Sequence, residues 1–229
     1  IFERTEHGWV WAHVYQFDAE TATFIVECLP DTWDRWGFAD MSKEETVETC
    51  RKIFAAHLGG HELMSNAAHL RGSAVWMQFP RVICGQWYHE NVVLMGDAAA
   101  TGHFSIGSGS RLAFDSAIAL AEYLHSEPDM KSAFERYQAE RRVEVLRLQS
   151  AARNSLEWFE EVERYLDLPP QQFAYSLLTR SQRISHENLR LRDPAWLRET
   201  EDWFAAQYGG QAGRTPMFAP FQLRGLTLE

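Results

Sequence analysis

One segment of the chain combines residue types that suit cofactor chemistry. It covers Val92–Gly109, VVLMGDAAATGHFSIGSG. An apolar strand ending in Gly96–Asp97 would place a carboxylate at the carboxyl edge of a sheet, where α/β folds bind ligands. A carboxylate fixed there accepts hydrogen bonds from sugar-like hydroxyls, such as those of ribose or a ribityl chain. The segment therefore favours a flat cofactor that carries hydroxyl groups.

The residues that follow the carboxylate leave space for such a cofactor. The run 98–100 is three alanines, which let a large ligand approach the backbone. Gly107 and Gly109 would open a helix, whose unpaired N–H groups and positive dipole end favour negative charge. A helix end aimed at the pyrimidine edge of a reduced flavin would stabilise its negative charge.

Two other interpretations of this segment stay open from spacing alone. It also fits a tight strand-to-helix turn in which Asp97 caps the helix. A metallophosphatase site is the weaker alternative, because the further Asp, Asn and His ligands that it needs are not evident nearby.

Composition narrows the class of protein. The 229 residues suffice for one large domain or two modest ones, and 22 basic against 32 acidic residues give a net charge of −10. That balance argues against a nucleic-acid binder. No signal peptide and no run of about 20 apolar residues is visible, so we expect no membrane association. Three widely spaced cysteines are typical of reduced thiols, and we expect a cytoplasmic protein.

The first sixty residues predict a hairpin and a helix. His7–Phe17 and Ala22–Leu29 are rich in aromatic and β-branched residues, with a turn between them. Ser42 and Glu45 form a capping-box pattern that opens a helix, and Gly59–Gly60 should end it.

The middle of the chain predicts α/β structure. Gly72–Cys84 has the composition of a further strand, broken at Pro80. The short apolar run Asn91–Met95 is typical of a strand in a buried parallel sheet. From Gly107 to Leu124 small and apolar residues lie on nearly every side, which predicts a buried helix.

The last hundred residues predict helices. A long amphipathic helix should run over about Ser132–Tyr165 and end before Pro169–Pro170. Asp193–Pro194 should open a last helix that stops at Gly209–Gly210, followed by a linker over Gly209–Thr215. The arginines between Arg180 and Arg198 are interleaved with Glu and Leu, which predicts a solvated helix face.

Val92–Gly109 also resembles the GDAAH segment of flavoprotein aromatic hydroxylases built like para-hydroxybenzoate hydroxylase. More narrowly, the chain is similar to the salicylyl-CoA 5-hydroxylase and anthraniloyl-CoA monooxygenase group over GDAAATGHFSIGSGSRLAFDSAIALAEYL. In that group a His-Phe-Ser-Ile-Gly-Ser-Gly stretch replaces the usual Pro-containing stretch. The resemblance continues through Glu135–Glu160 and covers most of Trp9–Tyr208. The tail Thr215–Glu229 resembles the opening strand of old-yellow-enzyme-like barrels, to which some members are fused.

The chain departs from this family in two respects. The family motif has His where this chain has Ala100, which puts cofactor affinity or activity in doubt. The GxGxxG fingerprint that holds the ADP half of FAD in the family is absent from the sequence. We therefore expect that the N-terminal dinucleotide-binding half is missing, and that the isolated chain binds FAD weakly or not at all.

The resemblance implies an α/β (α+β) fold of the para-hydroxybenzoate-hydroxylase type. It implies a substrate-binding β-sheet domain over 1–88, the C-terminal part of an FAD-binding domain over 89–128 and a helical region over 129–208. The range 209–229 would hold a linker and the start of a barrel.

The resemblance further implies a function. The parent enzyme would use FAD, NAD(P)H and O2 to hydroxylate an aromatic ring through a flavin hydroperoxide. A 2-hydroxy- or 2-aminobenzoyl-CoA thioester, hydroxylated at position 5, is the implied substrate. A halogenase or epoxidase, or a non-catalytic flavoprotein remnant that acts as an interaction domain, stays open, as does a homodimer.

The candidate site residues follow from the resemblance. His103 would face the active site as a catalytic residue, and no metal site is expected. The residues expected to bind FAD are Gly96, Asp97, Ala98, Ile106, Gly107, Ser108 and Gly109. The residues expected to bind the substrate are Trp11, His13, Trp76, Gln78 and Phe104.

Overall fold

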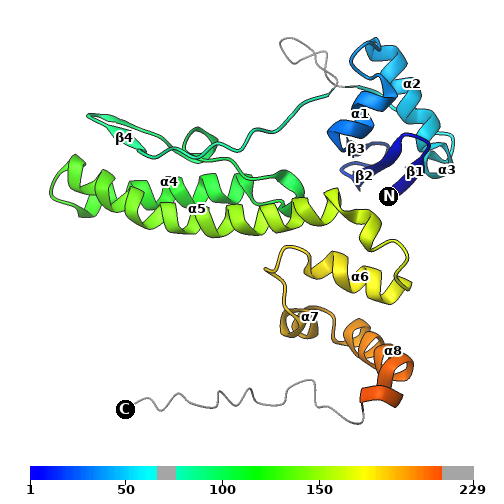
Figure 1. The fold of residues 1–229 in the computed structure, drawn as a ribbon. Coiled ribbons are helices and arrows are strands. Elements are labelled where there is room, and N and C mark those ends of the chain that lie inside the picture. Colours follow the sequence, from blue (N-terminus) through cyan, green and yellow to red (C-terminus); the bar gives the residue numbers. More distant parts are fainter. Residues whose placement is uncertain (66–75, 213–229) are drawn as a thin grey trace. The chain divides into compact units, whose positions relative to one another are not determined.

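The computed structural model describes residues 1–65 and 76–212 and has a mixed α/β structure (Figure 1). The chain forms two compact units, Ile1–Ile83 and Cys84–Glu229, and each is described by itself. The predicted linker lies partly, and the barrel-like tail entirely, outside the described residues. The functions predicted for the four segments stay predictions.

The first unit is built on a three-stranded antiparallel sheet in the order β1-β2-β3. Its strands are β1 (Phe2–Thr5), β2 (Gly8–Gln16) and β3 (Ala22–Cys28), so the predicted hairpin is confirmed. The turn is closed by Asp18, whose Oδ1 accepts the backbone N–H groups of Glu20 and Thr21 at 2.8 and 2.7 Å.

Alternation along β2 separates the two faces of this sheet. Val10 and Ala12 point to one face, where they form a core with Phe54. Trp11 and His13 point to the other face. The second face therefore carries two of the residues predicted to bind substrate.

Three helices complete the described part of the first unit: α1 (Pro30–Trp36), α2 (Lys43–Ile53) and α3 (Ala55–Leu58). The predicted capping box at Ser42 and Glu45 is present with both of its hydrogen bonds. The chain leaves α3 through Gly59, whose φ of 58° favours glycine.

The strand predicted over Gly72–Cys84 is wrong for its described part, because residues 76–84 contain no β-strand. Pro80 has no N–H to donate to a ladder, and the flanking Met77 and Phe79 are exposed rather than packed on a sheet. The rest of the predicted strand lies outside the described residues.

The strand predicted in a buried parallel sheet is also wrong. β5 (Val92–Val93) pairs antiparallel with β4 (Tyr88–His89) in a two-stranded hairpin, and Val92 is 60% exposed. Glu90 has a positive φ of 50° and turns the chain back on itself. The strand residues of the run Asn91–Met95 therefore pair with Tyr88–His89, which come just before it in the chain.

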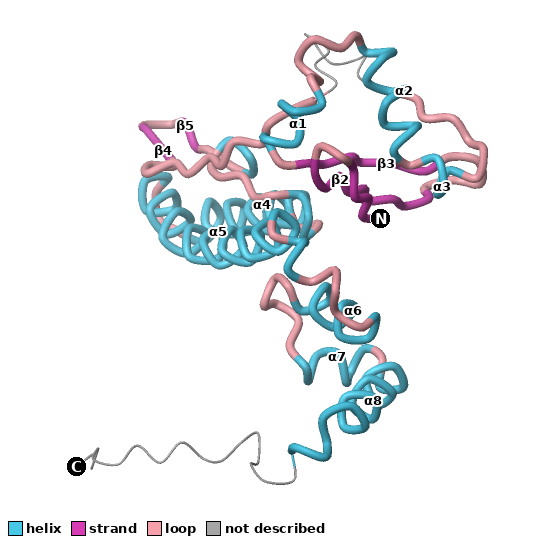
Figure 2. The backbone as a smooth tube through the Cα atoms, turned by 45° about the vertical axis from the view of Figure 1, so that its right-hand side comes forward, coloured by secondary structure: helices cyan, strands magenta, loops and turns pink. Residues whose placement is uncertain are grey.

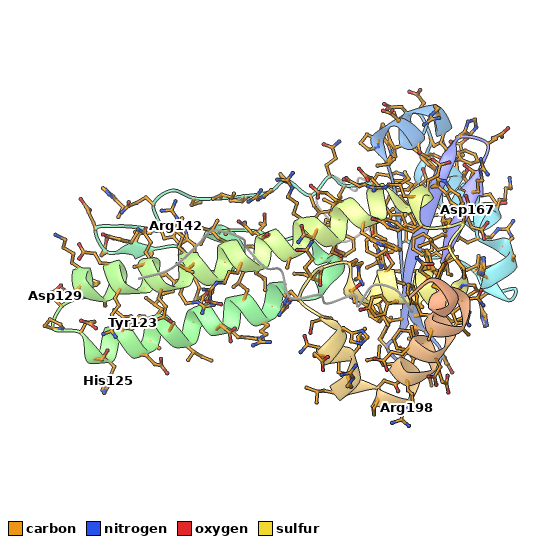
Figure 3. All side chains as sticks on the ribbon, turned by 60° about the horizontal axis from the view of Figure 1, so that its bottom comes forward. Tyr123, His125, Asp129, Arg142, Asp167 and Arg198 are labelled. Atoms are coloured by element: carbon orange, nitrogen blue, oxygen red, sulfur yellow. The ribbon has the colours of Figure 1, made fainter. Side chains whose placement is uncertain are left out.

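The second unit is dominated by two long helices that pack side by side: α4 (Gly109–Ser126) and α5 (Met130–Glu160) (Figures 1 and 2). Asp129 lies at the turn between them and caps α5 by accepting the N–H of Ser132 at 2.8 Å (Figure 3). The predicted long helix is thus confirmed, although it begins two residues earlier and ends at Glu160.

The expectation that the first of these helices is buried on nearly every side is wrong. Leu112, Ala119 and Tyr123 of α4 are buried, but Phe114 and Ile118 are 68% and 58% exposed. Within the described chain α4 packs against α5 and the Gly-Asp segment only on one side. An apolar face of α4 is therefore exposed among the described residues.

Short elements and three helices make up the rest of the second unit as far as Ala212. Two 3-10 turns, η2 (Gly96–Ala98) and η3 (Phe104–Ile106), precede α4, and η4 (Val162–Arg164) follows α5. The last helices are α6 (Pro170–Thr179), α7 (His186–Arg192) and α8 (Pro194–Ala212).

The beginning of α8 is as predicted and its end is not. Asp193 accepts the N–H of Trp196 at 3.0 Å, as an N-cap should. The helix continues through Gly209–Gly210 to Ala212. A glycine costs a helix only about 1 kcal/mol relative to Ala, which does not by itself end one. Over residues 1–65 and 76–212, no helix combines the length and apolar character that crossing a membrane requires.

Candidate functional site

The Gly-Asp segment presents its carboxylate to solvent. Gly96 has a φ of 57°, and a Cβ at this position would lie 3.2 Å from the Cβ of Ala113, so the segment is pressed against α4. Asp97 is exposed, and none of the described residues hydrogen-bonds to its carboxylate. The alternative in which Asp97 caps a helix is therefore not supported.

The three alanines after Asp97 do not share one role. Ala98 is exposed, whereas Ala99 and Ala100 are each 2% exposed and belong to the core of the unit. Their N–H groups both bond to the carbonyl oxygen of Gly96, at 3.0 and 3.1 Å. Only Ala98 leaves open backbone surface, and the side chain of Ala100 faces the core rather than a ligand.

Helix α5 holds the strand end of the segment in place. Gln138 accepts the backbone N–H of Trp87 through its Oε1 at 2.7 Å. One residue earlier on the helix, the Tyr137 hydroxyl donates to the carbonyl oxygen of Leu94 at 3.2 Å. Both ends of the β4–β5 hairpin are thus fixed to α5.

The same helix holds the loop beyond Asp97. Gln149, which is 3% exposed, donates its Nε2 to the carbonyl oxygen of Thr101 at 2.7 Å. The hydroxyl of Ser105 donates to that of Ser155, which is fully buried, at 3.0 Å. Because α5 rises about 1.5 Å per residue, these contacts lay the segment along roughly 27 Å of helix.

His103 caps the turn η3 rather than pointing away from it. Its Nδ1 accepts the N–H of Ser105 at 3.3 Å, and its ring stacks on Phe104 with centroids 4.5 Å apart. A neutral imidazole that accepts through Nδ1 carries its proton on Nε2. Nε2 is therefore the donor atom of this ring in its neutral form.

The start of α4 has backbone N–H groups that no side chain caps. Gly107 has a φ of 60° and ends η3, and a Cβ there or at Gly109 would meet nothing within 4 Å. Ser108 is the N-cap residue, but its hydroxyl donates to the carbonyl oxygen of Ile106 at 3.2 Å instead of capping the helix. This open end with unpaired amides can accept an anionic or polar edge of a ligand.

The arginines after α6 are not all on a solvated face, and this prediction is wrong for Arg180. Its guanidinium is half-buried, and its Nη2 donates to the carbonyl oxygen of Ser105 at 2.9 Å. The exposed Arg183 also reaches the loop, because its Nη1 donates to the hydroxyl of Ser108 at 2.8 Å. Tertiary contacts across 75 residues, which periodicity cannot show, override the local pattern.

One further arginine of α5 is buried on the face that braces the segment. Arg141 is 8% exposed, and its Nε has no hydrogen-bond partner among the described residues. It lies one helical turn after Tyr137 and two turns before Gln149. A buried cation without a carboxylate partner is costly.

In the first unit, two predicted residues lie on the face of the sheet opposite to that of Val10 and Ala12. Trp11 is 3% exposed and lies opposite Glu27 in the β2–β3 register. The Nε2 of His13 is 2.5 Å from the Oε1 of the same Glu27. His13 and Glu27 therefore form a close polar pair beside an indole ring, and Glu27 was not singled out from the sequence.

The two other predicted residues of this unit are not brought to that strand. Trp76 is partly buried against the ring of Phe38, with centroids 4.7 Å apart, and Gln78 is exposed. A surface hollow of about 480 Å³ contains none of the predicted residues. It is lined by Glu3, Arg4, Thr5, Glu6, Trp36, Thr49, Lys52 and Ile53. Phe104 belongs to the second unit.

The histidines do not gather around a metal site in the described chain. Among residues 1–65 and 76–212, no group of three or more His, Cys, Asp and Glu side chains is placed to hold a metal ion. His57 instead forms an ion pair with Glu3, with 2.5 Å between Nε2 and Oε1.

Three curated proteins are similar to this chain, whereas no protein-family model matches it. Salicyloyl-CoA 5-hydroxylase of Streptomyces sp. is 36% identical over 228 residues, 95% of this chain and 42% of that protein. Protodeoxyviolaceinate monooxygenase of Chromobacterium violaceum is 36% identical over 166 residues, 72% of this chain and 43% of that protein. The 3-hydroxy-4-methyl-anthranilyl-[aryl-carrier protein] 5-monooxygenase of Streptosporangium sibiricum is 36% identical over 189 residues, 82% of this chain and 48% of that protein.

The chain is related to aromatic monooxygenases. It spans less than half the length of each of these relatives. Their names do not indicate a fused barrel, so the fusion stays a prediction.

Sequence reasoning missed the residues of this monooxygenase-like chain that support the loop from a distance. Tyr137 and Gln149 bond to this segment, and they lie at multiples of four residues along one face of α5 together with Arg141 and the buried Val145. Polar side chains that interrupt the apolar face of a long helix are the signal that could have found them. No comparable signal marks Arg180.

Proposed function

We propose that this chain forms part of an FAD-dependent aromatic monooxygenase. The observation that carries the proposal is the loop of the second unit, where the exposed carboxylate of Asp97 and the uncapped start of α4 are held by the buried side chains of α5. Similarity to three monooxygenases over 72–95% of the chain supports the same conclusion.

The residues present fit the flavin half of FAD. The open backbone at Gly107 and Gly109 allows a planar ring to approach, and the first N–H groups of α4 would stabilise negative charge on it. The exposed carboxylate of Asp97 would accept hydrogen bonds from ribityl hydroxyls. Gly96, Ala98, Ile106 and Ser108 complete the proposed cofactor-binding set. When bound, FAD supplies the oxygen chemistry, with NAD(P)H as reductant.

The protein's own part in the reaction is to place the ring and exclude water. We propose that His103 contacts a carbonyl or phenol oxygen of the substrate, beside Phe104. Trp11, His13, Trp76 and Gln78 are proposed to contact the substrate. Within this set, His13 is oriented by its contact with Glu27.

The proposed substrate is a 2-hydroxy- or 2-aminobenzoyl thioester, hydroxylated at position 5. Two relatives support this class by name, since one acts on salicyloyl-CoA and another on an anthranilyl group carried by a protein, both at position 5. The third relative is not named for a thioester.

We propose that an FAD-binding segment completes this chain, in the same polypeptide or as a separate one. The relatives are more than twice as long as the part that matches. Phe114 and Ile118 form an exposed apolar face on α4, the helix that begins at the proposed flavin loop. Apolar faces of this kind mark interaction sites.

The proposal is tested by an activity assay of the completed protein. The FAD-loaded protein is supplied with NADH or NADPH, oxygen and salicyloyl-CoA or anthraniloyl-CoA, and products are separated by mass. We expect a product heavier by one oxygen atom, with the label incorporated from ¹⁸O2. Oxidation of the nicotinamide without any oxygenated aromatic product would overturn the proposal.

A further inference from the structure

Arg180 ties three elements of the second unit together. Its Nη2 donates to the carbonyl oxygen of Ser105 and its Nε to the hydroxyl of Ser155, both at 2.9 Å. Its Nη1 donates to the carbonyl oxygen of Leu177 at 2.7 Å, and the guanidinium lies 5.0 Å from the centroid of Phe159. One side chain thus joins the loop, α5 and α6.

The chain just after Arg180 is shaped so that a second arginine reaches the same loop. Gln182 has a φ of 59°, in the left-handed region that non-glycine residues rarely adopt. Ser181 is buried, and its hydroxyl accepts the N–H of Arg183 at 3.3 Å. A strained backbone conformation persists only where the surrounding structure imposes it. Here the left-handed conformation of Gln182 comes just before Arg183, which bonds to Ser108.

These two arginines differ from their neighbours in what they bind. Arg190 pairs with the carboxylates of Glu187 and Glu201. No carboxylate of the described residues pairs with Arg180 or Arg183, whose acceptors are serine hydroxyls and backbone carbonyls. Burial lowers the pKa of the Arg180 guanidinium from its ordinary value. Because these guanidinium groups bond to neutral oxygens of the loop, we expect them to fix the geometry of the loop.

We infer that the turn over 180–183 is a clamp that positions the loop from Ser105 to Ser108. Arg180 and Arg183 are positioning residues, because they act through loop atoms. The clamp fixes the carbonyl of Ser105 and the hydroxyl of Ser108 on either side of Gly107. That this loop contacts a flavin rests on the proposed function above. The clamp itself rests only on the contacts of Arg180 and Arg183.

The test measures backbone hydrogen exchange in the 229-residue chain by mass spectrometry. The N–H groups of Gly107 and Leu112 bond to the carbonyl oxygens of Phe104 and Ser108, so their exchange reports on loop order. We expect Arg180→Gln and Arg183→Gln each to speed exchange in a peptide covering 103–112 by about tenfold. Exchange in peptides from the packed parts of α4 and α5 should not change. Arg198→Gln is the matched control, because Arg198 is exposed on α8 and is bonded to none of the described residues (Figure 3).

A double-variant cycle separates positioning from general support. If Arg183 acts through the hydroxyl of Ser108, the combined Arg183→Gln and Ser108→Ala variant exchanges no faster than Ser108→Ala alone. Additive effects, or exchange equal to that of the unchanged chain, would overturn the clamp. Acceleration spread over the whole second unit would do the same, since it would mean simple unfolding.

The outcome of this test is independent of flavin. In the completed protein, Arg180→Gln should also weaken FAD binding by about tenfold. If the unchanged protein binds no FAD while the exchange result holds, the proposed function fails and the clamp stands. If FAD binds and the exchange result fails, only the clamp is lost.

Discussion

Gln149 of α5 donates its side-chain amide to the carbonyl oxygen of Thr101 at 2.7 Å, across 48 residues of sequence. The glutamine is 3% exposed, so this hydrogen bond is shielded from water. It fixes the loop between the carboxylate of Asp97 and the turn at His103. The loop over Gly96–Gly109 therefore depends on a helix that carries none of the predicted site residues.

Replacing this glutamine should loosen the loop. Gln149→Leu removes the side-chain amide that donates to the carbonyl oxygen of Thr101, which should lower the free energy of unfolding by about 1 kcal/mol. Urea unfolding followed by circular dichroism measures the change. Gln171→Leu is the matched control, because Gln171 is exposed in the first turn of α6. Equal stability of the two variants would mean that the bond to Thr101 contributes nothing.

The buried arginine of the same helix should behave in the opposite way. Arg141 has no carboxylate partner among the described residues, so Arg141→Met exchanges a buried cation for an apolar chain of similar reach. We expect the free energy of unfolding to rise by about 1–3 kcal/mol. Arg142→Met, at an exposed neighbour that donates to the carbonyl of Gly85, should change it by less than about 0.5 kcal/mol. A loss of stability in Arg141→Met would show that the guanidinium has a partner in solution.

How far the sequence predicts this structure depends on the range of the interactions. The hairpin over β2 and β3, the capping box at Ser42 and the cap at Asp193 were predictable, because each depends on residues near one another in the chain. The hairpin formed by β4 and β5 was not, since a short apolar run does not say which strand it will pair with.

The candidate site divides in the same way. The glycines before α4 were expected to open a helix, which holds for Gly109, whereas Gly107 ends the turn η3. The support from Gln149 and Arg180 could not, because it comes from helices that are distant in sequence and meet the loop only in the folded unit. The same distance hid the pairing of His13 with Glu27 on a neighbouring strand.

Two cysteines report on the core of the first unit. Burial raises the pKa of the Cys28 thiol to about 12 and that of Cys50 to about 11. At pH 8 less than about one molecule in a thousand then carries either thiolate, so both should react slowly with a thiol reagent until the protein unfolds. Comparable fast labelling of all three cysteines in the folded chain would contradict this burial.

The same shifts set a dependence of stability on pH. An unfolded thiol releases its proton near the ordinary value of 9.0, while the folded thiols keep theirs to about pH 11 or 12. Above pH 9 the unfolded state binds fewer protons, so the free energy of unfolding should fall as pH rises from 9 towards 11. In Cys28→Ala/Cys50→Ala protein this alkaline loss should be smaller. An equal loss in both proteins would assign it to other groups.

The open face of α4 should matter for assembly and not for folding. Phe114→Ser with Ile118→Ser should leave the thermal midpoint of this chain nearly unchanged, because both side chains are exposed. It should weaken capture of the FAD-binding segment in a co-purification by about tenfold or more. Leu191→Ser, at an 83% exposed position on α7, serves as control. Undiminished capture by the α4 variant would exclude this face as the docking site.

The central claim, that Gly96–Gly109 is a flavin-contacting loop, is tested most directly by titrating FAD and reading its absorbance and fluorescence. We predict weak or no binding by this chain alone and stoichiometric binding once the completing segment is supplied. Asp97→Ala should then weaken binding by about tenfold, whereas Asp167→Ala, at an exposed control position (Figure 3), should not. A completed protein that stays colourless, or one that binds FAD equally well without the Asp97 carboxylate, would contradict the account.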